Sequence, residues 1–111
     1  MLSLHLVEFP ADDLERATRF WEGLLEVPLG ERTGDEGSGR ETHGDGPAIG
    51  VHERGSGPGD RFSLPYFSVG DIAAAQARVV ELGGSIVHPG ERFAICRDSE
   101  GSPFGLAAKG V

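Results

Sequence analysis

The chain is poor in cysteine, which could cross-link it, and in basic residues, which could bind polyanions. Its 111 residues include one cysteine, Cys96, so no internal disulfide can form, which is typical of a reducing compartment. Basic residues number 10 against 18 acidic ones, a formal net charge of −8 that repels nucleic acid and anionic membranes. No stretch approaches the ~18 apolar residues of a membrane span, and the N-terminus lacks signal-peptide features. We therefore expect a cytoplasmic protein with no nucleic-acid or membrane partner.

Glycine, in contrast, is abundant. The 18 glycines concentrate between Gly30 and Gly50, between Gly55 and Gly59, and at single turn positions in the second half of the chain. Glycines placed in this way separate short strands, whereas a low-complexity tail would contain them without such order.

The stretch from 9 to 25 predicts the end of a strand, a turn and an amphipathic helix from about Asp13 to Leu25. Asp12 and Glu15 have the spacing of a capping box. Apolar residues recur at helical period and form one stripe, which comprises Leu14, Ala17, Phe20, Trp21, Leu24 and Leu25. We expect this stripe to be buried, with Phe20 and Trp21 in the core.

The same pattern occurs twice in the chain. Positions of equivalent character recur at one constant offset in the stretch from 67 to 84, for example Phe9 and Phe67, or Asp13 and Asp71. This repeat indicates a duplicated structural unit of about fifty residues.

Each half is predicted to have the order β-α-β-β-β. The expected strands are 2–9, 27–33, 40–43 and 48–53, then 62–69, 85–88, 93–97 and 104–108, and the expected helices are 13–25 and 71–82. A glycine-rich turn is predicted at 34–39. Residues 1–54 and 62–111 would form two modules of one domain, joined by a polar linker at 55–61. One helix covers only one face of each four-stranded unit, so the other face must meet the second half, a partner chain or a ligand.

Three segments, in this order, resemble the vicinal oxygen chelate superfamily of glyoxalases, bleomycin-resistance proteins and extradiol dioxygenases. They are DDLERATRFWEGLL, YFSVGDIAAAQARVVELGG and FAICRDSEGSPFGLA. The resemblance implies an α+β glyoxalase-like fold in which two βαβββ modules form an open, cup-shaped sheet. It also implies a homodimer, since small members tend to pair. In metal-using members, four inward His, Glu or Gln side chains hold a divalent ion in the cup.

Carried over to this chain, the four ligand positions are poor in donor atoms. Three fall on Leu6, Leu64 and Gly105, whose side chains cannot coordinate a metal. The fourth lies near 50–52, where Val51 and His52 are both compatible with the pattern. We therefore expect no metal cofactor. The alternative is a divalent metal on His5 and His52, which requires a one-residue shift of the first strand that would turn its side chains to the opposite face.

The remaining histidines and the cysteine have simple interpretations. His43 and His88 adjoin glycine or proline turns and are expected to face solvent. Cys96 is expected to be a small buried side chain with no catalytic role. The short connection at 89–92, next to the cup, suggests an open mouth.

The cup is expected to be lined by the ligand-binding candidates Leu6, Glu8, His52, Leu64 and Tyr66. Glu8 is the candidate catalytic residue, as a base or as an anchor for a ligand's donor group. A salt bridge or exposure at the mouth is the alternative interpretation of Glu8. The preferred function is binding of a small organic molecule without metal, and whether the protein sequesters, senses or converts that molecule stays open. The alternatives are a metal-dependent enzyme similar to lactoylglutathione lyase or a dioxygenase, a metal-free isomerase or lyase that uses Glu8, and a pure interaction or antibiotic-sequestration protein. Whether the protein is an enzyme stays open.

Overall fold

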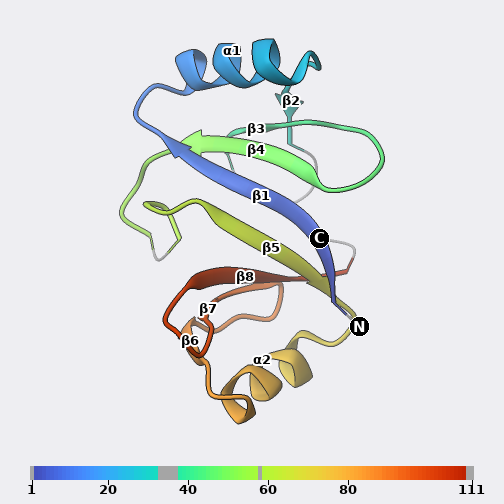
Figure 1. The fold of residues 1–111 in the computed structure, drawn as a ribbon, viewed down its shortest axis with the longest axis vertical. Coiled ribbons are helices and arrows are strands. Elements are labelled where there is room, and N and C mark those ends of the chain that lie inside the picture. The colour runs from blue at the N-terminus through green and yellow to red at the C-terminus, as the bar shows by residue number, and fades with distance from the viewer. Residues whose placement is uncertain (1, 33–37, 58, 110–111) are drawn as a thin grey trace.

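One mixed sheet forms the body of the protein (Figure 1). The computed structural model describes residues 2–32, 38–57 and 59–109. Within these residues the first half contains β1 (Ser3–Ala11), α1 (Leu14–Leu25), β2 (Gly30–Glu31), β3 (Arg40–Glu41) and β4 (Ala48–Glu53). The second half contains β5 (Leu64–Val69), α2 (Ile72–Glu81), β6 (Ser85–His88), β7 (Phe93–Arg97) and β8 (Pro103–Ala108). Neither of these helices is long and apolar enough to span a membrane.

The sheet places the two halves side by side. Its strand order is β2-β3-β4-β1-β5-β8-β7-β6, so the halves join where β1 pairs antiparallel with β5. In each half the first and last strands are parallel neighbours, β1 with β4 and β5 with β8. Figure 1 shows α1 and α2 at opposite ends of the molecule's long axis. The α+β fold of two βαβββ units with an open sheet is confirmed.

Both helices begin at an aspartate that caps the first turn. The Asp13 carboxylate accepts a hydrogen bond from the Arg16 backbone N–H at 3.0 Å, and Asp71 accepts one from Ala74 at 3.0 Å. The prediction that Asp12 caps the first helix is therefore wrong. Asp12 instead pairs with the Arg54 guanidinium at 2.9 Å.

The apolar stripe of α1 is only partly covered. Trp21 stacks on Phe9 of β1, with ring centroids 4.7 Å apart. Phe20 and Leu24 are 60% and 65% exposed, so the expectation that the whole stripe is buried is wrong, and Phe20 is not a core residue. The helix packs on β4, and the neighbouring strands β2 and β3 have two residues each, which leaves little sheet beneath the outer part of the stripe.

The second half has the better-covered core. Its buried cluster comprises Val69, Ile72, Ala94, Cys96 and Leu106, against which Ala75 and Val79 of α2 pack. Cys96 is fully buried, as expected, and burial raises the pKa of its thiol. A buried thiol with a raised pKa is a packing residue and a poor nucleophile.

β1 differs from the predicted strand in two ways. It continues through Pro10 to Ala11, which is possible because its pairing with β5 ends at Glu8 and leaves that side without a ladder partner. It also contains a bulge. Leu4 pairs with Phe67 and Leu6 pairs with Tyr66, so His5 is an extra residue on β1.

The segment after α1 is less regular than predicted. Within the described residues, the strand expected at 27–33 is reduced to β2, and the strand expected at 40–43 is reduced to β3. Residues 33–37, which include most of the turn predicted at 34–39, lie outside the described residues.

Candidate functional site

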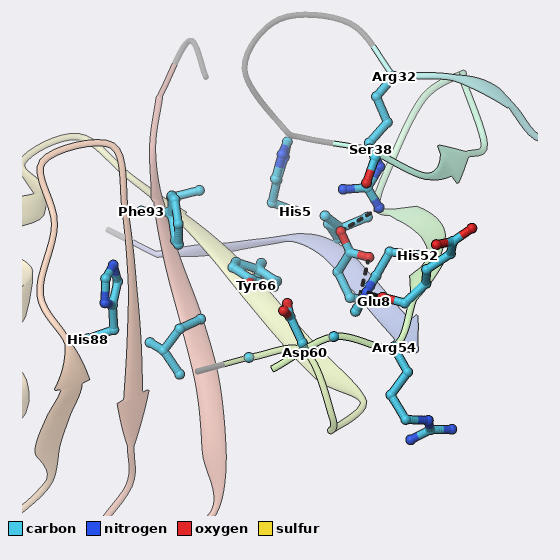
Figure 2. Close-up of a pocket in the computed structure, with 16 residues that line it drawn as sticks. His5, Glu8, Arg32, Ser38, His52, Arg54, Asp60, Tyr66, His88 and Phe93 are labelled. Atoms are coloured by element: carbon cyan, nitrogen blue, oxygen red, sulfur yellow. Dashed lines mark hydrogen bonds and ion pairs between the residues drawn. The ribbon is translucent and has the colours of Figure 1, made fainter. Parts of the chain in front are cut away.

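A pocket of about 670 Å³ lies across the junction of the two halves (Figure 2). The first half contributes His5, Leu6, Glu8, Arg32 and His52, and the second contributes Tyr66, His88, Phe93, Ile95 and Ala107. In the view of Figure 2, Tyr66 lies between a polar end with Glu8 and His52 and an aromatic end with His88 and Phe93. The pocket therefore offers both charged and apolar surface to one ligand.

Glu8 is buried in an ion pair. Its Oε1 lies 2.5 Å from Nη2 of Arg32, and the two side chains are 8% and 5% exposed. Gly50 of β4 makes this approach possible, since a Cβ there would come within 2.6 Å of the same guanidinium nitrogen. Of the interpretations that the sequence left open for Glu8, the structure shows a salt bridge, at a position that still lines the pocket.

Arg32 is the most consequential site residue that sequence reasoning missed. It lies between two buried carboxylates, since its Nε is also 3.4 Å from Oε1 of Glu41 on β3. The available signal was charge balance, because a carboxylate on an otherwise apolar strand requires a cation nearby. Several arginines could have met that requirement, and the sequence did not distinguish them.

The second oxygen of Glu8 has no such partner. Oε2 is buried and accepts no hydrogen bond from the residues that the structure describes. Nε2 of His52 lies 4.0 Å from it (dashed in Figure 2). His52 and Gly50 share the face of β4 that meets the pocket, whereas Val51 is fully buried. Of the two residues that the sequence left open, His52 is the one that lines the pocket.

Tyr66 forms the middle of the pocket floor. Its ring lies directly against Gly105 of β8, the paired residue on the neighbouring strand, and leaves no room there for a Cβ. Burial, followed by the negative charge of Glu8, raises the pKa of Tyr66 to about 12. The hydroxyl therefore stays protonated at neutral pH and can donate a hydrogen bond.

Leu64 and the predicted linker differ from expectation. Leu64 pairs with Glu8 across the β1–β5 seam, but it is 1% exposed and is not among the residues that line the pocket. A Cβ on Gly59 would come within 2.9 Å of its side chain. Gly59 and Asp60, from the segment 55–61, line the pocket, and Asp60 accepts a hydrogen bond from the Gly57 N–H at 2.8 Å. The segment thus contributes to the pocket wall as well as connecting the halves.

Two histidines reach the pocket by routes that the sequence did not reveal. The β1 bulge lets His5 and Leu6, which are adjacent in sequence, both line the pocket, so no shift of the whole strand is needed. His88 is exposed, as expected, but it also lines the pocket and stacks on Phe93 with ring centroids 5.7 Å apart. His43 instead bonds the Glu31 carbonyl at 2.9 Å and is not a lining residue.

The residues at the ligand positions implied by the fold do not fit a divalent metal. Leu6 and Leu64 offer no donor, and Gly105 is covered by the Tyr66 ring. At the fourth position His52 is a single donor, and the neighbouring Gly50 is packed against a guanidinium cation that would repel a metal ion. The described residues contain no group of three or more His, Cys, Asp or Glu side chains suited to hold a metal.

Solved structures with the same fold include proteins of different chemistry. A hypothetical protein of Bacillus halodurans is 17% identical with a TM-score of 0.75, covering 99% of this chain and 96% of its own. A Streptomyces coelicolor methylmalonyl-CoA epimerase, in complex with 2-nitronate-propionyl-CoA, is 14% identical with a TM-score of 0.64, covering 98% and 95%. A Legionella pneumophila structure described as an NAD-dependent benzaldehyde dehydrogenase is 12% identical with a TM-score of 0.71, covering 93% and 96%. At these identities the likeness concerns the fold alone.

Family membership rests on the sequence. Among curated proteins, none matches this chain. The model of the glyoxalase-like domain, however, matches residues 6–107, which span both halves and every strand of the pocket. The chain therefore belongs to the glyoxalase-like domain family, within the vicinal oxygen chelate superfamily.

Proposed function

We propose that the protein binds a small organic molecule in the pocket between its halves, and that it does so without a metal ion. The observation that carries the proposal is the buried Oε2 of Glu8, which faces the pocket and accepts no hydrogen bond from the described residues. A buried carboxylate oxygen left unsatisfied costs free energy, and a ligand's donor group would recover it. The cavity of about 670 Å³ lies within the usual range for small-molecule sites.

The charges around the pocket support binding without metal. Arg32 already supplies the cation that Glu8 requires, at 2.5 Å. A divalent ion beside the same carboxylate would face this guanidinium, and the described residues contain no group of three or more His, Cys, Asp or Glu side chains suited to hold it. The pocket instead presents hydrogen-bonding groups at one end and apolar side chains, such as Phe93 and Ile95, at the other.

The test is a fragment screen by ligand-observed NMR on untagged protein, combined with elemental analysis. We expect hits whose binding is lost in Glu8→Gln and Tyr66→Phe but kept in Glu100→Gln, which removes an exposed carboxylate outside the pocket. Stoichiometric bound metal would contradict the metal-free part of the proposal. Hits that are unaffected by Glu8→Gln and Tyr66→Phe would contradict the placement of the site.

A second candidate is acid–base catalysis, as in an isomerase or lyase. The observation that favours it is the presence of a carboxylate and a protonated phenol in one pocket, since Glu8 is close enough to raise the pKa of Tyr66. Glu8 could accept a proton from a bound molecule while Tyr66 donates one. A Glu8→Gln variant that binds a substrate but does not convert it would support catalysis. Equal turnover by the variant would exclude Glu8 as the base.

A further inference from the structure

Two hydrogen-bond acceptors face each other at the polar end of the pocket. Oε2 of Glu8 and Nε2 of His52 are 4.0 Å apart, too far for a direct hydrogen bond. Both side chains are largely buried, 8% and 14% exposed, and both line the pocket. Whether these two atoms need an external hydrogen-bond donor depends on whether either of them carries a hydrogen.

The other nitrogen of the imidazole settles the tautomer. Nδ1 of His52 lies 2.8 Å from the Glu53 carbonyl oxygen, which can only accept a hydrogen bond. Nδ1 therefore carries the hydrogen. A neutral imidazole has one N–H, so Nε2 presents a lone pair to Glu8.

Glu8 cannot supply the missing hydrogen either. Its Oε1 is held in an ion pair 2.5 Å from the Arg32 guanidinium, and this contact fixes the orientation of the carboxylate. The arginine thereby points the second oxygen, Oε2, toward His52. With a neutral His52, the pair is two buried acceptors with no proton between them, an arrangement that calls for an external donor.

We propose that this pair binds the protonated primary amine of the ligand. The inference rests on the proposed function, because it names the class of molecule that the same pocket takes. An ammonium nitrogen at the usual ~2.8 Å from each atom can bridge a separation of 4.0 Å and donate one hydrogen to Oε2 and another to Nε2. The rest of the ligand would be an apolar or aromatic body that extends past Tyr66 toward Phe93 and Ile95.

The local charge favours a cation at this point. Among the described residues, the Arg32 guanidinium is shared by two buried carboxylates, Glu8 and Glu41. Burial and the negative charges of Glu8 and Asp60 raise the pKa of Tyr66, and the positive charge of Arg32 lowers it by less than Glu8 raises it, so the carboxylates outweigh the guanidinium at this phenol. An alcohol would offer one hydrogen to two acceptors, and a carboxylate ligand would offer none while adding a second negative charge.

The first test needs no ligand. Nitrogen-15 NMR of the four histidines, with His52 identified by its loss in His52→Phe, reports the protonation of each ring nitrogen. We expect His52 to carry its hydrogen on Nδ1, toward the Glu53 carbonyl, and none on Nε2. A doubly protonated His52 would overturn the inference, because the imidazolium would already satisfy Glu8.

The second test compares matched probes of one shape, 2-phenylethylamine and 2-phenylethanol, titrated by NMR at the same pH. We expect the amine to bind at least about tenfold more tightly. Glu8→Gln should abolish this preference, and His52→Phe, which removes one of the two acceptors, should reduce it without abolishing it. Glu100→Gln, the matched loss of an exposed carboxylate, should leave it unchanged. His52→Phe leaves the Glu8–Arg32 pair in place, so it remains informative if Glu8→Gln fails to fold.

The outcomes separate this inference from the proposed function. Equal binding of the amine and the alcohol, or binding only of neutral or anionic fragments in the pocket, would overturn the amine site and leave the proposed function standing. An absence of any fragment binding in the pocket would overturn both.

Discussion

The ring of Tyr66 rests on the α-carbon of Gly105, its partner on the parallel neighbouring strand. Any side chain at this position of β8 would overlap the ring. The glycine therefore positions the one tyrosine of the chain as the floor of the pocket.

Gly105→Ala should displace the Tyr66 ring and destabilise the protein by about 1–3 kcal/mol, as for other overpacked sites. The measurement is chemical denaturation of the variant and of the Gly105→Ala/Tyr66→Ala double variant, in which the clash is absent and the added cost of Gly105→Ala should be smaller. Gly23→Ala is the control. Its Cβ would meet no atom within 4 Å, and alanine in a helix should stabilise by about 0.5–1 kcal/mol. A neutral effect of Gly105→Ala would contradict the contact.

Tyr66 can be titrated without interference, because it is the only tyrosine. We expect phenolate absorbance to develop with a midpoint near pH 12, as the pKa of about 12 requires, and to shift to lower pH in Glu8→Gln, which removes a negative charge. Because the folded pKa exceeds the ordinary value of 10.0, the stability from the neutral buried phenol is present below pH 10 and is lost as the pH rises toward about 12. The absorbance is read immediately after a rapid pH jump, so that the phenol titrates before the protein unfolds. The midpoint in Glu100→Gln, the control, should equal that of the unsubstituted protein. An unshifted midpoint in Glu8→Gln would contradict the coupling.

Arg32→Met should be among the most destabilising single changes in the pocket. It leaves Glu8 and Glu41 as buried carboxylates without their guanidinium, and breaking a buried pair typically costs about 3–5 kcal/mol. The comparison is Arg54→Met, which breaks the exposed pair with Asp12 and should cost under about 1 kcal/mol. Similar unfolding free energies for the two variants would show that the Arg32 network is not buried in solution.

Asp13 should make the first helix sensitive to acid. The hydrogen bond from the Arg16 backbone N–H holds the pKa of Asp13 below its ordinary value of 3.8. Its stabilising effect is therefore present above pH 3.8 and is lost as the pH falls through the lowered pKa. Asn can cap a helix without titrating, so Asp13→Asn should flatten this part of the acid-denaturation profile. Asp12→Asn should leave this part of the acid-denaturation profile unchanged. Identical acid-denaturation profiles for the two variants would contradict the assignment of Asp13 as the cap.

Much of the architecture was predictable because it follows from local patterns. Strands β4, β6 and β7 have the predicted boundaries, since turn residues frame each of them. The repeat was visible because Asp13 and Asp71 precede equivalent helices, and the structure shows them in the same capping role.

The missed features depend on residues that are far apart in sequence. The bulge at His5 exists only in the pairing of β1 with β5, so strand alternation alone could not reveal it. Arg32 meets Glu8 across β4, above a glycine that looks like any other in a glycine-rich sequence. Phe20 is exposed because little of the sheet lies beneath α1. The helical periodicity of the sequence predicts an apolar face but not the extent of the surface that covers it.

The pairing of β1 with β5 also separates two kinds of pocket-lining residue. The charged and imidazole groups of Glu8, Arg32 and His52 belong to the first half, whereas the apolar surfaces of Phe93 and Ile95 belong to the second. On the proposed mode of binding, selection for a ligand of a different shape can act on one repeat while the other keeps the anchor. On that mode of binding, one half would supply the anchor for the charge of a ligand and the other most of the apolar surface that fits its outline.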